Sequence, residues 1–144
     1  MTLPLFPPEH GVSVWDTSAI IALKENNISR NERRLVLNAL RERVIDGLLF
    51  FPPEVIRELE LFKSAPTVRD ELVEWARSCQ PAATSVPVDF EQVKVILNRV
   101  PTLVDLDASY DQADPYVIAL ALQLLNQGFE AIVVTEDRRD TVNR

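Results

Sequence analysis

The sequence predicts an α/β protein in which helices cover both faces of a parallel β-sheet. Short apolar segments that suit buried strands alternate with longer segments whose apolar residues recur at helical spacing. Two of the strand-like segments run directly into acidic residues, at the strand ends where α/β proteins bind their ligands. No internal repeat, low-complexity tract or long linker divides the chain, so we expect one domain over residues 1–144.

The first half of the chain predicts two strands and three helices. A strand is expected at residues 12–15, and the capping residues DTS that follow it should begin a helix. A second helix is expected over residues 30–46, with Gly47 as its stop. The apolar segment 48–51 predicts a buried strand, and the helix after it should carry Pro53 in its first turn.

The second half predicts three helices and one strand. Helices are expected over residues 68–77 and 90–99, and both look architectural. A longer helix should run over residues 114–127, with Gly128 closing it. The segment 131–134 (AIVV) predicts a buried strand that leads into Thr135, Glu136 and Asp137.

The composition is that of a soluble globular protein, with 47% apolar and 26% charged residues. No apolar run approaches the ~20 residues needed to span a bilayer. The opening residues MTLPLFPPEHG also lack the basic start of a secretory signal. We therefore expect a cytoplasmic protein.

Cysteine and histidine are too scarce for much side-chain chemistry. Cys79 and His10 are each the only residue of their type, so one chain can form neither a disulfide nor a Cys/His zinc site. A Ser–His or Cys–His nucleophile would depend on His10, in a proline-rich N-terminal segment. Carboxylates should therefore carry any chemistry.

The net charge of −7 argues against a protein that coats nucleic acid with its whole surface. A local site is still allowed, because a cation bound among acidic groups reverses the charge that an anionic substrate meets. Basic residues concentrate in residues 30–43 and 138–144. Either group could contact phosphate, although a solvated helix face is the simpler interpretation of the first.

Asp16 and Asp137 occupy equivalent places, each at or just beyond the carboxyl end of an apolar strand. In open α/β sheets, ligands bind at this edge. Considered alone, either residue is better explained as a helix cap or a turn residue than as a functional residue. The coincidence of the two favours a functional site.

Asp114 is a third candidate, at the start of the long helix. It precedes Pro115 and could simply cap this helix. It also begins a helical stripe that should pack on the sheet, so its carboxylate is expected near the upper edge of the core. The other members of that stripe are Ile118, Ala121 and Leu125. Asp111 could add a further acid or belong to the loop.

Glu58 is the fourth candidate, in the helix that follows Pro53. Helical spacing puts it nearest to the apolar stripe of Val55, Leu59 and Phe62, whereas Glu54 and Glu60 point farther outward. Considered alone, Glu58 would be a solvated surface glutamate.

Chemistry gives a reason for gathering such acids. Hard cations such as Mg²⁺ take oxygen ligands and are often held by only a few carboxylates. Without a cation, the cluster would be mutually repulsive. One or two ions could orient and deprotonate a water for in-line attack on phosphorus, so no side-chain nucleophile is needed.

Four segments together resemble, in order, the acidic motifs of the PIN-domain family. The set spans nearly the whole chain, and each motif is weak alone. The last two segments are especially similar to a prokaryotic branch related to the VapC-type toxins. The four segments are VSVWDTSAIIAL, PPEVIRELE, ADPYVIALAL and VVTED.

The resemblance implies a PIN-like three-layer α/β/α sandwich with a central parallel sheet, and an RNA-cleaving site that uses Mg²⁺ or Mn²⁺. Many relatives are toxins neutralised by an antitoxin protein, and many form homodimers. PIN domains usually continue into another short strand, whereas this chain stops seven residues after Asp137, so a truncated chain or a reduced sheet edge is expected. The implied roles are catalysis for Asp16, Glu58, Asp114 and Asp137, metal binding for Asp16, Asp114 and Asp137, support for Thr17, Thr135 and Asp111, and contact with substrate phosphate for Arg138.

Three functions compete at this point. The first is a metal-dependent endoribonuclease, the toxin of a toxin–antitoxin pair. The second is a PIN-fold binding or scaffold module with little catalysis. The third is an acid phosphatase or small-molecule hydrolase that uses Asp16 as its nucleophile, which predicts a phosphorylated Asp16 intermediate.

Overall fold

A parallel three-stranded sheet forms the centre of the protein. The computed structural model describes residues 11–25, 28–62, 70–103 and 112–136. Within these ranges, β1 (Gly11–Trp15) lies between β2 (Leu49–Phe50) and β3 (Glu130–Val134), and both pairings are parallel. The predicted α/β class and parallel sheet are confirmed.

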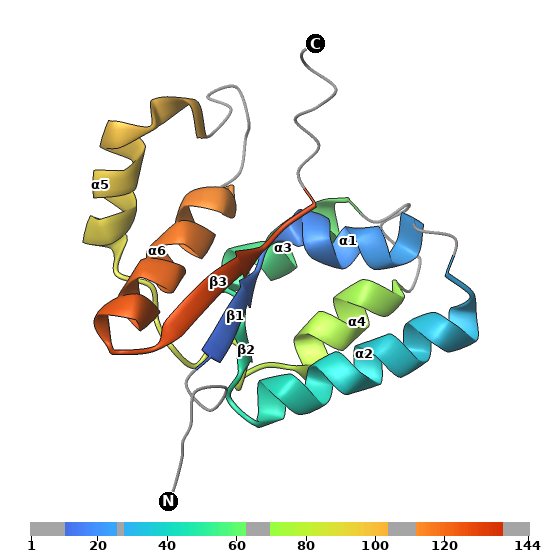
Figure 1. Ribbon diagram of the computed structural model, residues 1–144. Coiled ribbons are helices and arrows are strands. Elements are labelled where there is room, and N and C mark those ends of the chain that lie inside the picture. The colour runs from blue at the N-terminus through green and yellow to red at the C-terminus, as the bar shows by residue number, and fades with distance from the viewer. Residues whose placement is uncertain (1–10, 26–27, 63–69, 104–111, 137–144) are drawn as a thin grey trace, which may run out of the picture.

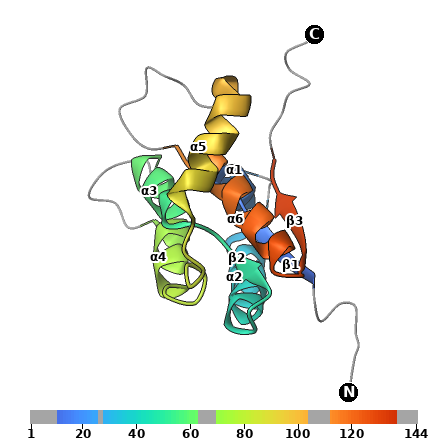
Figure 2. The same ribbon diagram turned by 90° about the vertical axis from the view of Figure 1, so that its left-hand side faces the viewer.

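Six α-helices pack around this sheet in the described part of the chain. Figure 1 shows α5 and α6 on one side of the sheet and α1, α2 and α4 on the other, and in Figure 2 α5 and α6 lie in front of the strands. The helices are α1 (Thr17–Glu25), α2 (Arg30–Ile45), α3 (Pro53–Leu61), α4 (Glu71–Ser78), α5 (Phe90–Arg99) and α6 (Asp114–Asn126), and a 3-10 turn, η2, covers Pro101–Leu103.

The strand register brings two chain segments together at one edge of the sheet. Trp15, the last residue of β1, lies beside Val134, the last residue of β3. The backbone N–H of Asp16 then donates to the carbonyl of Val134 at 3.1 Å. Because parallel strands end at the same edge, Asp16 and Thr135 follow their strands side by side.

The sequence-predicted strand at residues 48–51 is shorter than expected, since β2 covers only its two middle residues. Hydrogen bonding explains the difference. The N–H of Leu48 donates to the carbonyl of Arg43 at the end of α2 (2.9 Å), and the N–H of Phe51 donates to the carbonyl of Ala83 (3.1 Å). The N–H groups of both flanking residues are therefore used outside the pairing with β1, while the carbonyl of Leu48 still accepts from the backbone N–H of Ser13 at 2.9 Å.

Helix boundaries follow the capping signals closely. Ser29 and Glu32 form a capping box at the start of α2, and Gly47 (φ +75°) and Gly128 (φ +97°) follow the ends of α2 and α6. α4 begins at Glu71 because the Asp70 side chain caps it, later than the predicted start at residue 68. Residues 68 and 69 lie outside the described ranges.

The core lies between the sheet and the helices. Val14, Leu49 and Leu120 are fully buried there. The indole N–H of Trp75 donates to the carbonyl of Leu37 at 2.8 Å, and its ring lies 5.9 Å from that of Phe51. These contacts pack α4 against α2 and against the residue that follows β2.

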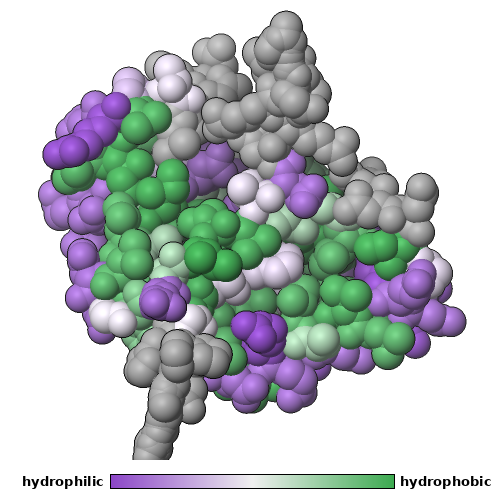
Figure 3. All heavy atoms as spheres, in the orientation of Figure 1, coloured by the Kyte–Doolittle hydropathy of each residue, from purple (hydrophilic) through white to green (hydrophobic). Residues whose placement is uncertain are grey.

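β3 is one of the two edge strands of the described sheet, and two of its apolar residues remain accessible. Ile132 is 63% exposed and Val133 is 40% exposed. Figure 3 shows apolar residues gathered on the face over α6 and β3. Among the described helices, none is both long enough and apolar enough to cross a bilayer.

Candidate functional site

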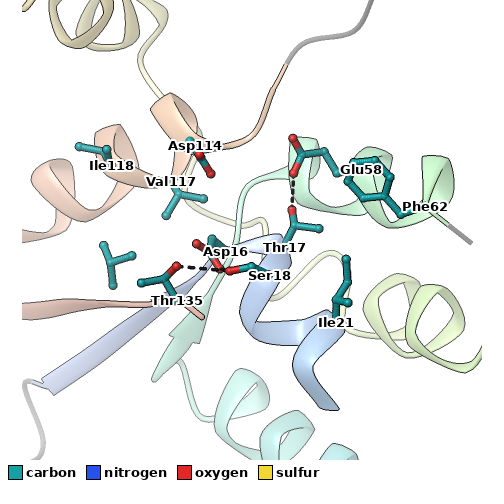
Figure 4. Close-up of a pocket in the computed structure, with 11 residues that line it drawn as sticks. Asp16, Thr17, Ser18, Ile21, Glu58, Phe62, Asp114, Val117, Ile118 and Thr135 are labelled. Atoms are coloured by element: carbon teal, nitrogen blue, oxygen red, sulfur yellow. Dashed lines mark hydrogen bonds between the residues drawn. The ribbon is translucent and has the colours of Figure 1, made fainter. Parts of the chain in front are cut away.

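A pocket of about 580 Å³ opens at the carboxyl edge of the sheet. Five elements contribute to it: the ends of β1 and β3 and parts of α1, α3 and α6. Figure 4 shows Asp16, Thr17, Ser18 and Asp114 directed toward a common space, with Glu58 beside Thr17. The lining residues are Asp16, Thr17, Ser18, Ile21, Glu58, Phe62, Asp114, Val117, Ile118, Val133 and Thr135.

Asp16 lies at the floor of this pocket and is only 8% exposed. Its Oδ1 accepts hydrogen bonds from the Ser18 hydroxyl (2.8 Å) and from the backbone N–H of Ala19 (3.0 Å). The second bond is a helix N-cap, so the capping interpretation of this residue is correct. Among the described residues, Oδ2 accepts no hydrogen bond, and the carboxylate can serve the pocket as well as the helix.

Ser18 joins Asp16 to the end of β3. Its hydroxyl accepts a hydrogen bond from the backbone N–H of Glu136 (3.0 Å) and lies 3.3 Å from the hydroxyl of Thr135. Thr135, a predicted supporting residue, therefore lines the pocket and lies next to Ser18. Ser18 itself was predicted only as a capping residue, and no local pattern reveals its contact with a segment more than 100 residues away.

Glu58 is buried, at 8% exposure, so the expectation of a solvated surface glutamate is wrong. Its Oε1 accepts a hydrogen bond from the Thr17 hydroxyl at 2.5 Å, and its Oε2 accepts one from the backbone N–H of Ala113 at 2.9 Å. Thr17 therefore forms a hydrogen bond within the pocket, and its supporting role in a functional site stays a prediction. The residues that share the inner face of α3 with Glu58, Val55 and Leu59, are also buried.

Asp114 is the first residue of α6 and lines the pocket. Unlike Asp16, it is exposed to solvent. The capping interpretation is not observed, because the cap position is Ala113 and carries no side-chain cap. The predicted stripe is also wrong at its far end, where Leu125 is 48% exposed. The inner face of α6 instead consists of Val117, Leu120, Ala121 and Leu124.

Three predicted site residues lie outside the described ranges: Asp111, Asp137 and Arg138. In the part of the chain that the structure describes, no group of three or more His, Cys, Asp or Glu side chains is arranged to hold a metal ion. The expected trio of metal ligands includes Asp137 and so extends beyond these residues. Two of its members, Asp16 and Asp114, line the same pocket.

The pocket has apolar walls that the sequence did not predict. Ile21 and Phe62 lie on the side of α1 and α3, and Val117, Ile118 and Val133 lie on the side of α6 and β3. Phe62 follows Glu58 by one helical turn, and 56% of its surface is exposed. No Lys or Arg is among the described residues that line the pocket.

Comparison with known proteins gives a family without an assigned activity. No curated protein and no solved structure matches the chain. The sequence profile of one family, described as Domain of unknown function (DUF4411), matches residues 14–144. These residues include the end of β1, the whole of β3 and all the residues that line the pocket. The chain therefore belongs to the DUF4411 family.

Proposed function

We propose that this chain is a Mg²⁺- or Mn²⁺-dependent endoribonuclease of PIN-like fold, with the pocket as its active site. One observation carries the proposal: Asp16, Glu58 and Asp114 come from distant parts of the chain and line one pocket at the carboxyl edge of a parallel sheet. Ligands of α/β proteins bind at such edges. The order of the acidic motifs and the parallel sheet support the PIN-like assignment.

The side chains of the pocket fit a hard divalent cation. Asp16 and Asp114 offer carboxylate oxygens, Ser18 and Thr135 offer hydroxyls, and no described lining residue is basic. Mg²⁺ is commonly held by one or two carboxylates together with substrate phosphate oxygens. Asp16 and Asp114 would hold the ion, joined by Asp137. When bound, the ion would supply Lewis-acid polarisation of the phosphodiester and acidify a water.

The chain's own residues orient and enclose the substrate. Ser18 and the Ala19 N–H fix Asp16 through Oδ1, which leaves Oδ2 for the pocket. Asp114, at the more exposed rim, would complete the pair of carboxylates. The apolar side chains around them limit the access of water, which strengthens electrostatic interactions in the pocket.

A single-stranded nucleotide suits this combination of acidic floor and apolar wall. The phosphodiester would lie near Asp16 and Asp114, the residues that would hold the cation. A base could then rest on Phe62, because aromatic side chains stack on any unpaired base. The resemblance to toxins further suggests an antitoxin protein as a partner and a homodimer as the assembly.

The second candidate is a binding or scaffold module with little catalysis. One observation favours it: Oδ1 of Asp16 and both carboxylate oxygens of Glu58 already accept hydrogen bonds within the protein. Such bonds would be needed for folding whether or not the pocket performs chemistry.

Cleavage of end-labelled single-stranded RNA in the presence of Mn²⁺ separates the two candidates. The native protein should cut, EDTA should stop it, and Asp16→Asn and Asp114→Asn should each lose most of the activity. Asp89→Asn is the matched control, because Asp89 caps α5 outside the pocket and should leave cleavage intact. Equal cleavage by all variants would indicate a contaminating nuclease, and no cleavage by the native protein would favour the binding module.

A further inference from the structure

Both carboxylate oxygens of Glu58 accept hydrogen bonds from donors elsewhere in the protein, whereas Asp16 accepts through Oδ1. Oε1 accepts from the Thr17 hydroxyl at 2.5 Å, across 41 residues of chain, and Oε2 accepts from the Ala113 N–H at 2.9 Å, across 55 residues. The residue is only 8% exposed. Removing an acceptor from two buried donors costs more than the bonds themselves contribute, so this arrangement constrains the local fold.

The two donors belong to the first turns of two helices that carry candidate ligands. Thr17 is the first residue of α1 and follows Asp16, and Ala113 immediately precedes Asp114 at the start of α6. Ala113 has no side chain that can accept the free N–H groups of the first turn of α6, and its own N–H donates to the carboxylate of Glu58. A negative charge between two helix N-termini is also favoured by both helix dipoles.

We propose that Glu58 is a positioning residue, not a metal ligand: its carboxylate ties the start of α1 to the start of α6 and thereby sets the spacing of Asp16 and Asp114. The effect on metal binding rests on the proposed function. The two hydrogen bonds that Glu58 accepts from Thr17 and Ala113, together called the Glu58 bridge, are a property of the fold alone. Groups that orient metal ligands commonly alter metal affinity by 10- to 100-fold when removed, roughly as much as some ligands do. A simple loss-of-function variant therefore cannot separate the two roles.

Glutamine at this position separates them. In Glu58→Gln, the amide oxygen can accept from the Ala113 N–H, and the amide nitrogen can donate to the Thr17 hydroxyl, which has lone pairs to accept. The bridge is kept while the negative charge is lost. In Glu58→Ala, both bonds are lost. The matched control is Glu54→Gln, because Glu54 lies one turn earlier on α3, pairs with Arg57 and does not line the pocket.

Two measurements on the full-length variants test the proposal. The first is hydrogen exchange of the Ala113 amide by NMR without metal. Exchange should be roughly tenfold or more faster in Glu58→Ala, as expected for the loss of a bond to a charged acceptor. It should be near native in Glu58→Gln and in Glu54→Gln. An Ala113 exchange rate in Glu58→Ala equal to that of the native protein would show that Glu58 does not bridge the two helix starts.

The second measurement is a Mn²⁺ titration of the same proteins by calorimetry. Affinity should fall by roughly 10- to 100-fold in Glu58→Ala and stay within about threefold of native in Glu58→Gln. If Glu58→Gln binds Mn²⁺ as weakly as Glu58→Ala while its Ala113 amide remains protected, Glu58 is a ligand and the proposal is wrong. If native protein binds no Mn²⁺, the proposed metal-dependent function fails, while the exchange data still decide whether the bridge exists.

Discussion

Asp16 combines a helix cap with a predicted metal ligand, and two substitutions should separate these roles. Its Oδ1 caps α1 through the N–H of Ala19, a residue that is only 4% exposed. In Asp16→Ala that donor is left without its acceptor, which should lower the free energy of unfolding by about 1–2 kcal/mol. Asn caps helices as well as Asp does, so Asp16→Asn should stay within about 0.5 kcal/mol of the native protein.

Urea denaturation monitored by tryptophan fluorescence measures these differences, and a thermal melt should shift by roughly 2–4 °C per kcal/mol. Mn²⁺ binding should behave differently, because both substitutions remove the carboxylate charge and both should abolish tight binding. A native-like Mn²⁺ affinity for Asp16→Asn would refute the ligand role. A stability loss in Asp16→Asn equal to that of Asp16→Ala would refute the capping account.

Asp70 provides the control. It caps α4 through the N–H groups of Leu72 and Val73, it is as buried as Asp16 at 8% exposure, and it lies outside the pocket. Asp70→Ala should therefore destabilise the protein by at least as much as Asp16→Ala. Its Mn²⁺ affinity should remain native.

Three further predictions concern pH, packing and substrate contact. Burial raises the pKa of Asp70, but the hydrogen bond and charge of Lys24 and the N–H groups of Val73 and Leu72 outweigh it and lower the pKa overall. The native protein should therefore be more stable than Asp70→Asn at neutral pH. This difference in unfolding free energy should disappear as the pH falls through the lowered pKa, below the ~3.9 of an unfolded Asp. Urea melts from pH 7 to 2 measure the difference, and a difference that does not change with pH would count against the ion pair. Leu120→Ala should lower the free energy of unfolding by about 2–5 kcal/mol in urea melts, because Leu120 is fully buried. Leu122→Ala, on the partly exposed side of α6, should lower it clearly less. Equal losses would contradict the packing described for this helix. Phe62→Ala should weaken binding of a single-stranded RNA oligonucleotide by about 1–3 kcal/mol in a fluorescence anisotropy titration. Phe90→Ala is the control, because Phe90 lies on α5 with similar exposure and should not affect binding. Equal losses of affinity in the two variants would contradict a stacking role for Phe62.

The sequence predicted the secondary structure well where local chemistry decides it. Helical spacing and the stop signals at Gly47 and Gly128 located α2 and α6 to within a residue or two. The strand at residues 48–51 was predicted too long because a tertiary hydrogen bond sets its end. Phe51 leaves the strand because its N–H bonds to Ala83, and no pattern within residues 48–51 encodes that partner.

The candidate site was predictable in its acids but not in their hydrogen bonds. The strand-end position of Asp16 and the helical phase of Glu58 correctly indicated residues that line one pocket. The partners of Glu58 were not predictable, because one is a backbone N–H whose position depends on the packing of α6. The exposed face of α6 was also misjudged, since Asp114 and Leu125 were expected to share a stripe that packs on the sheet.

The apolar wall was missed for a similar reason. Phe62 was predicted to continue the apolar stripe of α3 with Val55 and Leu59, yet it lies at the end of the helix with 56% of its surface exposed. Helical spacing defines the face of a residue but not the depth of the neighbouring elements. Only the assembled fold distinguishes a core phenylalanine from one that lines a pocket.

Anomalous diffraction from a native crystal soaked in Mn²⁺ tests the central claim most directly. We predict an anomalous peak in the pocket, coordinated by the carboxylates of Asp16 and Asp114, with Glu58 still bonded to Thr17 and Ala113. A fully soaked crystal with no peak between Asp16 and Asp114, or with its manganese bound elsewhere, would contradict the account.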